Sequence, residues 1–184
     1  MIVSFCCWQN IALNAGAIQS STATSQYGSY AHSASLAVDG NINGGVNEKS
    51  VSSTNNVDDP SFWEVDLNGS YIISKIFVFN RFFAADRING FNLKVLDADN
   101  NAQYDYTADA TSPATGTNLF EIDLLQGDVG IKEGSKVRIE LSKEFTFENF
   151  LQLAEVMVFG EQVRYLKAWS QIQKNVLVRN YVCT

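Results

Sequence analysis

The sequence has 184 residues, 46% hydrophobic and 18% charged, which is enough to bury the core of one ordinary domain and too apolar for global disorder. Its net charge is −7, which disfavours nucleic-acid partners, and no apolar run approaches the roughly 20 residues of a membrane span. A single histidine, His32, excludes zinc sites built from several histidines, and no phosphate-binding glycine loop or nucleophile elbow is present.

Residues 1–8 form an apolar N-terminal extension that lacks the basic region and small-residue cleavage site of a signal peptide. The remnant of a signal peptide and a plain extension therefore both remain open. The three cysteines, Cys6, Cys7 and Cys183, match neither a zinc pattern nor a disulfide framework. Either Cys183 pairs with one of the other two, or all three are free thiols.

Residues 14–62 are rich in Ser, Thr, Asn, Gly and Ala and contain few apolar runs. A loop-rich segment of this length needs something to hold it, and a cation wrapped by oxygen ligands is one such device. The alternative is that its Asx-Gly clusters simply make turns. The candidate cation ligands of this segment are Asp39, Asn41, Asn43, Asn47, Glu48 and Ser50.

Strand patterns recur between residues 70 and 160. Residues 71–79 are rich in β-branched and aromatic side chains, while 91–95 and 137–141 alternate apolar and polar residues, as half-buried strands do. Residues 119–125 and 151–159 are predicted as two further strands, and Asn-Gly, Gly-Asp and Glu-Gly turns separate the set. Short strands with regular turns indicate an antiparallel sandwich or barrel.

The last 22 residues, 163–184, carry four basic side chains and no acidic one, so the rest of the chain has a charge of −11. This break predicts that the compact domain ends near residue 162. Helical spacing in the tail is compatible with a short helix packed on the domain, or with a segment that touches a partner or membrane surface. The residues at this spacing are Val163, Leu166, Trp169, Ile172 and Val176.

An ordered set of short blocks carries a family resemblance. The blocks are 33–41 (SASLAVDGN), 62–67 (FWEVDL), 76–81 (IFVFNR), 87–91 (RINGF) and 151–160 (LQLAEVMVFG). Over residues 9–162 the chain resembles the discoidin, or coagulation factor 5/8 type C, superfamily, and within it the F-type lectin (fucolectin) branch. The resemblance implies an all-β fold, an eight-stranded antiparallel jelly-roll β-sandwich with sugar-binding loops at one end.

The same resemblance implies a structural calcium ion beneath those loops. Its ligands would be the backbone carbonyl of Leu36 and the side chains of Asp39, Asn41, Ser50 and Glu155, all of which match the family in residue type. Two carboxylates with neutral oxygens are a donor set that suits calcium. For the first two side chains the alternative is an Asx turn, and for Glu155 it is a strand carboxylate paired with a backbone amide or an arginine.

The implied sugar site matches the family less completely. Arg81 occupies the first arginine position, and Arg87 corresponds to the second but lies six residues on. Alanines replace the adjacent cysteines of the family. Ser53 stands where the family has a histidine, and His32 lies too early in the chain to replace it. We therefore expect small polar contacts to a glycan from Ser53, Thr54, Asn55 or Asn56.

Phe82 and Phe83 lie in the loop between the two arginines. They would form an exposed platform for a sugar ring or a membrane spike, or one of them would fill the space left by the missing disulfide. The acidic body disfavours membrane binding. Trp63 is predicted as a core residue.

Three functions compete. The first is non-catalytic carbohydrate binding by an extracellular or cell-surface lectin or carbohydrate-binding module, assisted by oligomers or by attachment to an enzyme. The second is adhesion to a cell surface or membrane through Phe82 and Phe83. The third is an enzyme with paired carboxylates, which the absence of any catalytic motif disfavours. The candidate pairs for the third are Asp58 with Asp59 and Glu64 with Asp66.

Overall fold

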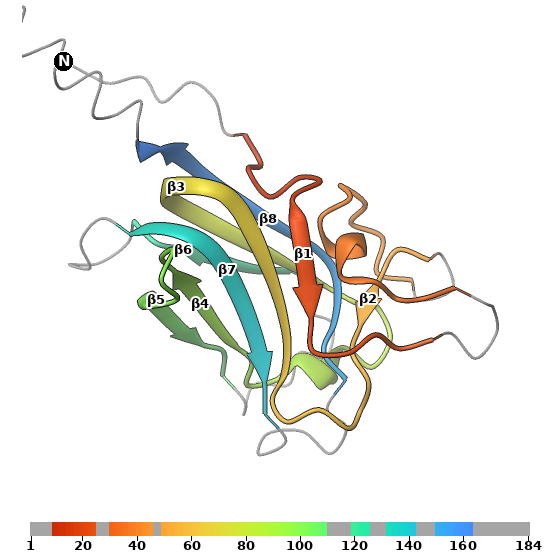
Figure 1. Cartoon of the computed structure of the whole chain (residues 1–184). Coiled ribbons are helices and arrows are strands. Elements are labelled where there is room, and N and C mark those ends of the chain that lie inside the picture. Colours follow the sequence, from red (N-terminus) through yellow and green to blue (C-terminus); the bar gives the residue numbers. More distant parts are fainter. Residues whose placement is uncertain are drawn as a thin grey trace, which may run out of the picture.

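The computed structural model describes residues 9–24, 30–45, 49–109, 119–125, 132–142 and 150–163. Within these ranges the protein is all-β, with eight antiparallel strands and short 3-10 turns (Figure 1). The strands are β1 (Gly16–Gln19), β2 (Ser52–Ser53), β3 (Ser61–Asn80), β4 (Asn92–Leu96), β5 (Ala102–Thr107), β6 (Leu119–Asp123), β7 (Glu133–Leu141) and β8 (Gln152–Gln162). The 3-10 turns are η1 (Ala34–Ala37) and η3 (Ala85–Ile88).

The long strand β3 belongs to both layers of the sandwich. Its first part, up to Asp66, pairs with β1 and β7, and its second part pairs with β8 from Tyr71 and with β6 from Lys75. At the bend, Tyr71 and Ile72 pair with both β7 and β8. Between the two parts the register shifts and Asn68 has a φ of 55°, so the strand bends over from one layer to the other (Figure 1). One layer is thus β1-β3-β7-β4-β5 and the other β6-β3-β8-β2.

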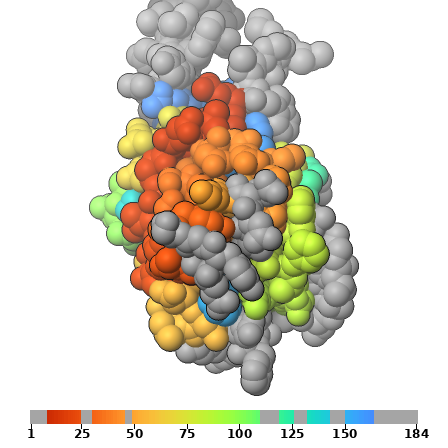
Figure 2. Space-filling view, turned by 90° about the vertical axis from the view of Figure 1, so that its right-hand side faces the viewer, coloured from red at the N-terminus to blue at the C-terminus, as the bar shows by residue number. Residues whose placement is uncertain are grey.

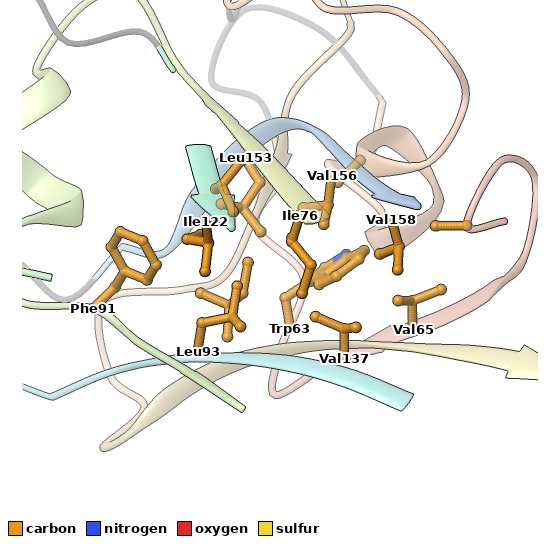
Figure 3. Close-up of a cluster of buried hydrophobic side chains, with 14 of the residues drawn as sticks. Trp63, Val65, Ile76, Phe91, Leu93, Ile122, Val137, Leu153, Val156 and Val158 are labelled. Carbon is orange, nitrogen blue, oxygen red and sulfur yellow. The ribbon is translucent and has the colours of Figure 1, made fainter. Parts of the chain in front are cut away.

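The core lies between these two layers. Trp63 and Val65 point inward from the first part of β3 (Figure 3). Ile76 points inward from its second part, beside Val156 and Val158 of the neighbouring strand β8. The indole Nε1 of Trp63 donates a 2.9 Å hydrogen bond to the carbonyl of Ala34, so its one polar atom is satisfied. The predicted core role of Trp63 is confirmed.

The first and last described segments lie side by side. Asn10 forms an isolated bridge with Phe159, and its Oδ1 accepts the Val158 N–H at 3.0 Å. Ile11 N–H donates to the Val158 carbonyl at 2.8 Å. These bonds attach the entering chain to the distal half of β8, at the end of the sandwich away from β2 (Figure 1).

All five predicted strands are present, and the jelly-roll fold class is confirmed. Three strands were missed. β1 and β5 are short, exposed along one side and lack an apolar run, and β2 has only two serines. β8 ends at Gln162 and Val163 is buried. Residues 1–8 and the tail after Val163 lie outside the described residues, so the domain boundaries stay predictions. All three cysteines lie there too, so their pairing also stays a prediction.

A ladder of charges crosses the outer face of the first layer. Arg138 donates to Glu64 at 3.2 Å and to Glu140 at 2.6 Å, and Lys94 donates to the other oxygen of Glu140 at 2.6 Å. The Arg138 guanidinium also lies 3.8 Å from the centre of the Phe62 ring. Burial raises the pKa of Glu140, but the bonds from Lys94 and Arg138 outweigh it, so its pKa lies below the usual value.

Glu140→Gln is expected to lower the free energy of unfolding at neutral pH by about 1 kcal/mol or less, because solvent weakens partly exposed ion pairs. A depressed folded-state pKa means that this stabilisation is present above the unfolded pKa and is lost as pH falls through the folded one. The difference between wild type and variant should therefore shrink below about pH 4 in denaturant titrations. Glu133→Gln, at the exposed end of β7, is the control. A difference that persists unchanged in acid contradicts the prediction.

Candidate functional site

The loop after β3 carries the first predicted arginine, and Asn80 fixes its shape. The Asn80 Nδ2 donates to the carbonyl of Ala85 at 2.8 Å, and its Oδ1 accepts the Arg81 N–H at 2.8 Å. Ala84 turns the chain with a φ of 50° and leads into η3, which carries Arg87. This loop brings the two arginines to one end of the sandwich.

Both arginines converge on one side chain, Gln152. Its Oε1 accepts a hydrogen bond from Nη1 of Arg81 and another, of 3.1 Å, from Nη1 of Arg87. Arg87 also lies 4.9 Å from the centre of the Phe150 ring. Gln152 begins β8 directly opposite Ser53 of β2, so the position where the family has a histidine neighbours the arginine pair.

Gln152 and Phe150 were not predicted from the sequence as site residues. Gln152 is only 8% exposed, although it is a polar residue between Leu151 and Leu153. A glutamine inside an apolar strand needs partners for its amide group. That isolated polar residue was the available signal.

Ser53 and Thr54, which are predicted to contact sugar, are almost fully buried, and their contact with a glycan stays a prediction. Ser53 Oγ donates to the carbonyl of Thr54 at 3.1 Å, and Thr54 Oγ1 accepts the Leu151 N–H at 3.0 Å. The Thr54 hydroxyl thus links the residue after β2 to the residue before β8. Asn55 is half-buried beside them, and its N–H donates to Ser21 Oγ at 2.9 Å.

His32 lies beside Ser53, although its sequence position had set it aside. The Ser53 N–H donates to the His32 carbonyl at 3.1 Å, and His32 Nδ1 is 2.8 Å from the carbonyl of Val51. Since a carbonyl oxygen can only accept, Nδ1 carries the proton and Nε2 is the acceptor in the neutral ring. The chain therefore has an imidazole close to the family's histidine position, supplied by another segment.

Phe82 and Phe83 are 49% and 71% exposed. The alternative that one of them fills the core in place of a disulfide is therefore wrong. Figure 2 shows the face of the molecule on which the orange atoms of the 30–45 segment and the yellow-green atoms of the segment after β3 both lie. The two exposed phenylalanines are available as apolar contacts.

The predicted metal ligand Glu155 is fully buried on the outer side of β8, under the loop that follows η1. Its Oε2 accepts the Gly40 N–H at 3.2 Å, and its Oε1 has no hydrogen-bond partner among the described residues. Burial raises the pKa of Glu155 to about 7, and the neighbouring charge of Asp39 acts in the same direction. A buried carboxylate oxygen without a partner, next to a second carboxylate, fits a bound cation.

The other predicted ligands lie along the loop whose Gly40 N–H bonds to this carboxylate. Asp39 Oδ1 accepts the Asn41 N–H at 2.8 Å, and buried Ser50 donates to the carbonyl of Asn43. Leu36 lies within η1, at the start of the loop. The described part of the chain contains no cluster of three acidic, histidine or cysteine side chains, so a cation here would depend on neutral oxygens. Candidates Asn47 and Glu48 lie outside the described residues.

Gly44 joins this loop to the arginine loop. Its carbonyl accepts the Phe82 N–H at 3.0 Å. A Cβ at this position would lie 2.8 Å from the Asn80 carbonyl oxygen and 2.8 Å from the Phe82 ring, closer than real contacts allow. Only glycine permits this approach, so the predicted metal loop supports the segment that carries Arg81.

The carboxylates considered for catalysis have structural partners. Asp58 Oδ2 accepts the hydroxyl of Ser20 at 2.6 Å and that of Ser21, which closes the loop before β3. Glu64 is bonded to Arg138 on the outer face of the first layer. Neither supports the paired-carboxylate hypothesis.

Comparison with known proteins agrees with this geometry. Residues 36–128 match the family described as NedA-like, galactose-binding domain, of the F5/F8 type C group. No curated protein matches the chain. No helix of the described residues is long and apolar enough to cross a membrane.

Solved structures give the same result. A fucose-binding module of Streptococcus pneumoniae is 34% identical, with a TM-score of 0.67 over 84% of this chain and 99% of that one. The lectin domain of lectinolysin, complexed with Lewis b antigen, is 30% identical, with a TM-score of 0.68 over 83% and 97%. A serum f-lectin of striped bass, Morone saxatilis, is 25% identical, with a TM-score of 0.62 over 83% of this chain and 47% of the lectin. The chain therefore belongs to the NedA-like, galactose-binding domain family of F5/F8 type C domains.

Proposed function

We propose that the protein is a non-catalytic carbohydrate-binding module or lectin whose glycan site is built on Arg81 and Arg87. The observation that carries this proposal is the convergence of both guanidinium groups on Gln152, at the loop-bearing end of the sandwich. The similarity to fucose-binding modules and lectins supports it. Fucose-type and galactose-type glycans are the first candidates.

The chemistry follows from the side chains present. A guanidinium group has five N–H donors in one plane, and two such groups held by one amide oxygen form a rigid set that suits neighbouring sugar hydroxyls. Gln152 fixes both arginines before the ligand arrives, which reduces the entropy lost on binding. The exposed rings of Phe82 and Phe83 supply apolar contact to the C–H face of a sugar.

Calcium is the second part of the proposal. Leu36, Asp39, Asn41, Ser50 and Glu155 would hold it, and the orphaned buried oxygen of Glu155 supports this assignment. When bound, the ion would neutralise the buried carboxylate and stiffen the loop. The hydrogen bond between the Gly44 carbonyl and the Phe82 N–H would then also hold the segment that carries Arg81 in place. Side chains, rather than the metal, would bind the sugar.

An extracellular or cell-surface setting fits a glycan ligand, and one of the similar lectins comes from serum. One small site binds a sugar weakly, so useful affinity requires several copies. We propose that homo-oligomers or attachment to an enzyme supply this multivalency.

The test is a glycan array with the wild-type protein, in excess calcium and again with a chelator. We expect binding to one class of fucosylated or galactosylated glycans that weakens when calcium is removed. Equal binding with and without the chelator contradicts the calcium assignment but not the carbohydrate proposal. No binding in either condition contradicts the carbohydrate proposal.

A second candidate function is adhesion to a membrane surface, which the exposure of Phe82 and Phe83 favours. Vesicles of phosphatidylcholine with phosphatidylserine test it directly. Binding that the Phe82→Ser/Phe83→Ser double variant loses, together with an array without hits, would favour this candidate. The acidic charge of the chain disfavours it.

A further inference from the structure

A groove of about 460 Å³ lies beside the predicted metal loop, residues 38–45, which follows η1. In the strand register, Phe79 of β3 stands opposite Leu119 of β6 on one side and Glu155 of β8 on the other, so the three side chains form a row on the outer face of this layer. The loop covers the Glu155 end of the row and leaves the other end open. The groove is lined by Asn41, Ile42, Asn43, Phe79, Phe82 and Leu119.

The lining is mostly apolar and open to solvent. Ile42 is 50% exposed, Phe82 49% and Leu119 41%, and these three come from separate segments of the chain. Single exposed apolar side chains are ordinary, but a group of them around one hollow marks a binding surface. The volume is also in the range of small-molecule sites.

The polar rim of the groove offers donors rather than acceptors. Asn41 Oδ1 accepts the Asn43 N–H at 3.0 Å, and Asn43 Oδ1 accepts the Gly45 N–H at 3.0 Å. No acceptor among the described residues takes a hydrogen bond from either side-chain NH₂ group. A ligand that fits this groove therefore needs an apolar part for the floor and an acceptor oxygen for the rim.

The groove adjoins the proposed sugar site. Phe82 follows Arg81 directly in the chain, and its N–H is bonded to Gly44, next to Asn43 on the rim. The loop that carries the proposed sugar site therefore also lines the groove, and we place the next residue of a glycan held by the arginines in it.

We propose that the groove binds the acetamido group of an N-acetylhexosamine linked to the sugar at Arg81 and Arg87. The acetamido methyl group would lie against Phe82 and Leu119, and its carbonyl oxygen would accept from the amide of Asn43. A plain hydroxyl in its place would leave the apolar floor uncovered. This inference rests on the proposed carbohydrate function and specifies its ligand class.

The test compares lactose with N-acetyllactosamine, and the fucosylated forms of both, by calorimetry. The members of each pair differ only by an acetamido group in place of one hydroxyl. We expect the acetamido member to bind roughly tenfold more tightly, since small apolar groups in a pocket give discrimination of this order. Leu119→Ser and Ile42→Ser should bring the ratio close to one and leave monosaccharide affinity unchanged. Leu125→Ser, an equally simple change at an exposed leucine outside the groove, should keep the full ratio.

The outcomes separate the two proposals. Equal affinities within each pair, with monosaccharide binding intact, overturn the groove assignment and leave the sugar site standing. Absence of any sugar binding overturns both. Binding of phosphatidylcholine vesicles that Leu119→Ser abolishes, without an acetamido preference, would assign the groove to lipid and also overturn the proposal.

Discussion

Arg81→Met is expected to lower the affinity for the glycan found on the array roughly a hundredfold. Each hydrogen bond from a charged donor contributes about 1.5–3 kcal/mol, so the loss of one or two to the sugar accounts for a change of this size. Methionine keeps the buried aliphatic stem of Arg81, which is only 8% exposed, and limits the damage to packing. Calorimetric titration with the free glycan measures the effect, and thermal unfolding verifies the fold.

Gln152→Leu separates positioning from direct contact. It removes the oxygen that both arginines share, and we expect a loss of roughly tenfold in affinity, because the donors remain but are no longer aligned. Gln152→Glu restores an acceptor and should recover most of the affinity.

Arg138→Met is the matched control for Arg81→Met. Arg138 is likewise an arginine with polar side-chain partners, but it is partly exposed and lies among the ion pairs of the other layer. It should lose some stability and no affinity. Wild-type affinity in a folded Arg81→Met variant would show that the sugar site lies elsewhere.

Glu155→Gln is expected to be less stable than the wild type in excess calcium, and equally or more stable than the wild type in chelator. In excess calcium the wild type should gain roughly 3 kcal/mol, the value for a ligand at a hundred times its dissociation constant, and unfold about 5–10 °C higher. The variant should gain little of this. In chelator the variant should equal or exceed the wild type, because it no longer buries a carboxylate oxygen without a partner.

Differential scanning calorimetry in both conditions measures the two effects. Glu161→Gln, on the more exposed part of the same strand, should respond to calcium as the wild type does. A Glu155→Gln variant that is less stable than the wild type in chelator by the same margin as in calcium would mean that Glu155 has a purely structural partner.

The sequence predicted the parts of the fold in which burial sets the pattern. The continuous apolar run of 71–79 and the alternation of 137–141 both identify strands, because such residues must face a core. β5 lies at an edge with most of its side chains exposed, so its sequence, AQYDYT, carries no comparable pattern. β2 consists of two serines that are buried by their neighbours rather than by their own apolarity.

The site divides in the same way. Arg81 and Arg87 could be predicted from their place after a recognisable block. The isolated position of Gln152 was a signal, but its two partners could not be predicted, because they lie 71 and 65 residues earlier in the chain and only the folded register brings them together. The burial of Ser53 could not be predicted, because a small polar residue is typical of loop surfaces. Here the neighbouring segments, including that of His32, bury it.

The bridge between Asn10 and Phe159 bears on how such a domain can be combined with others. The segment at Asn10 and the end of β8 are adjacent. Gln152, at the start of β8, is six residues before Val158, so it lies roughly 20 Å away along the strand. The domain could therefore be spliced into a loop of a host protein through a single narrow stalk, with its ligand-binding end pointing outward. Several such inserted domains in one protein would each keep their site exposed, away from the connections between domains.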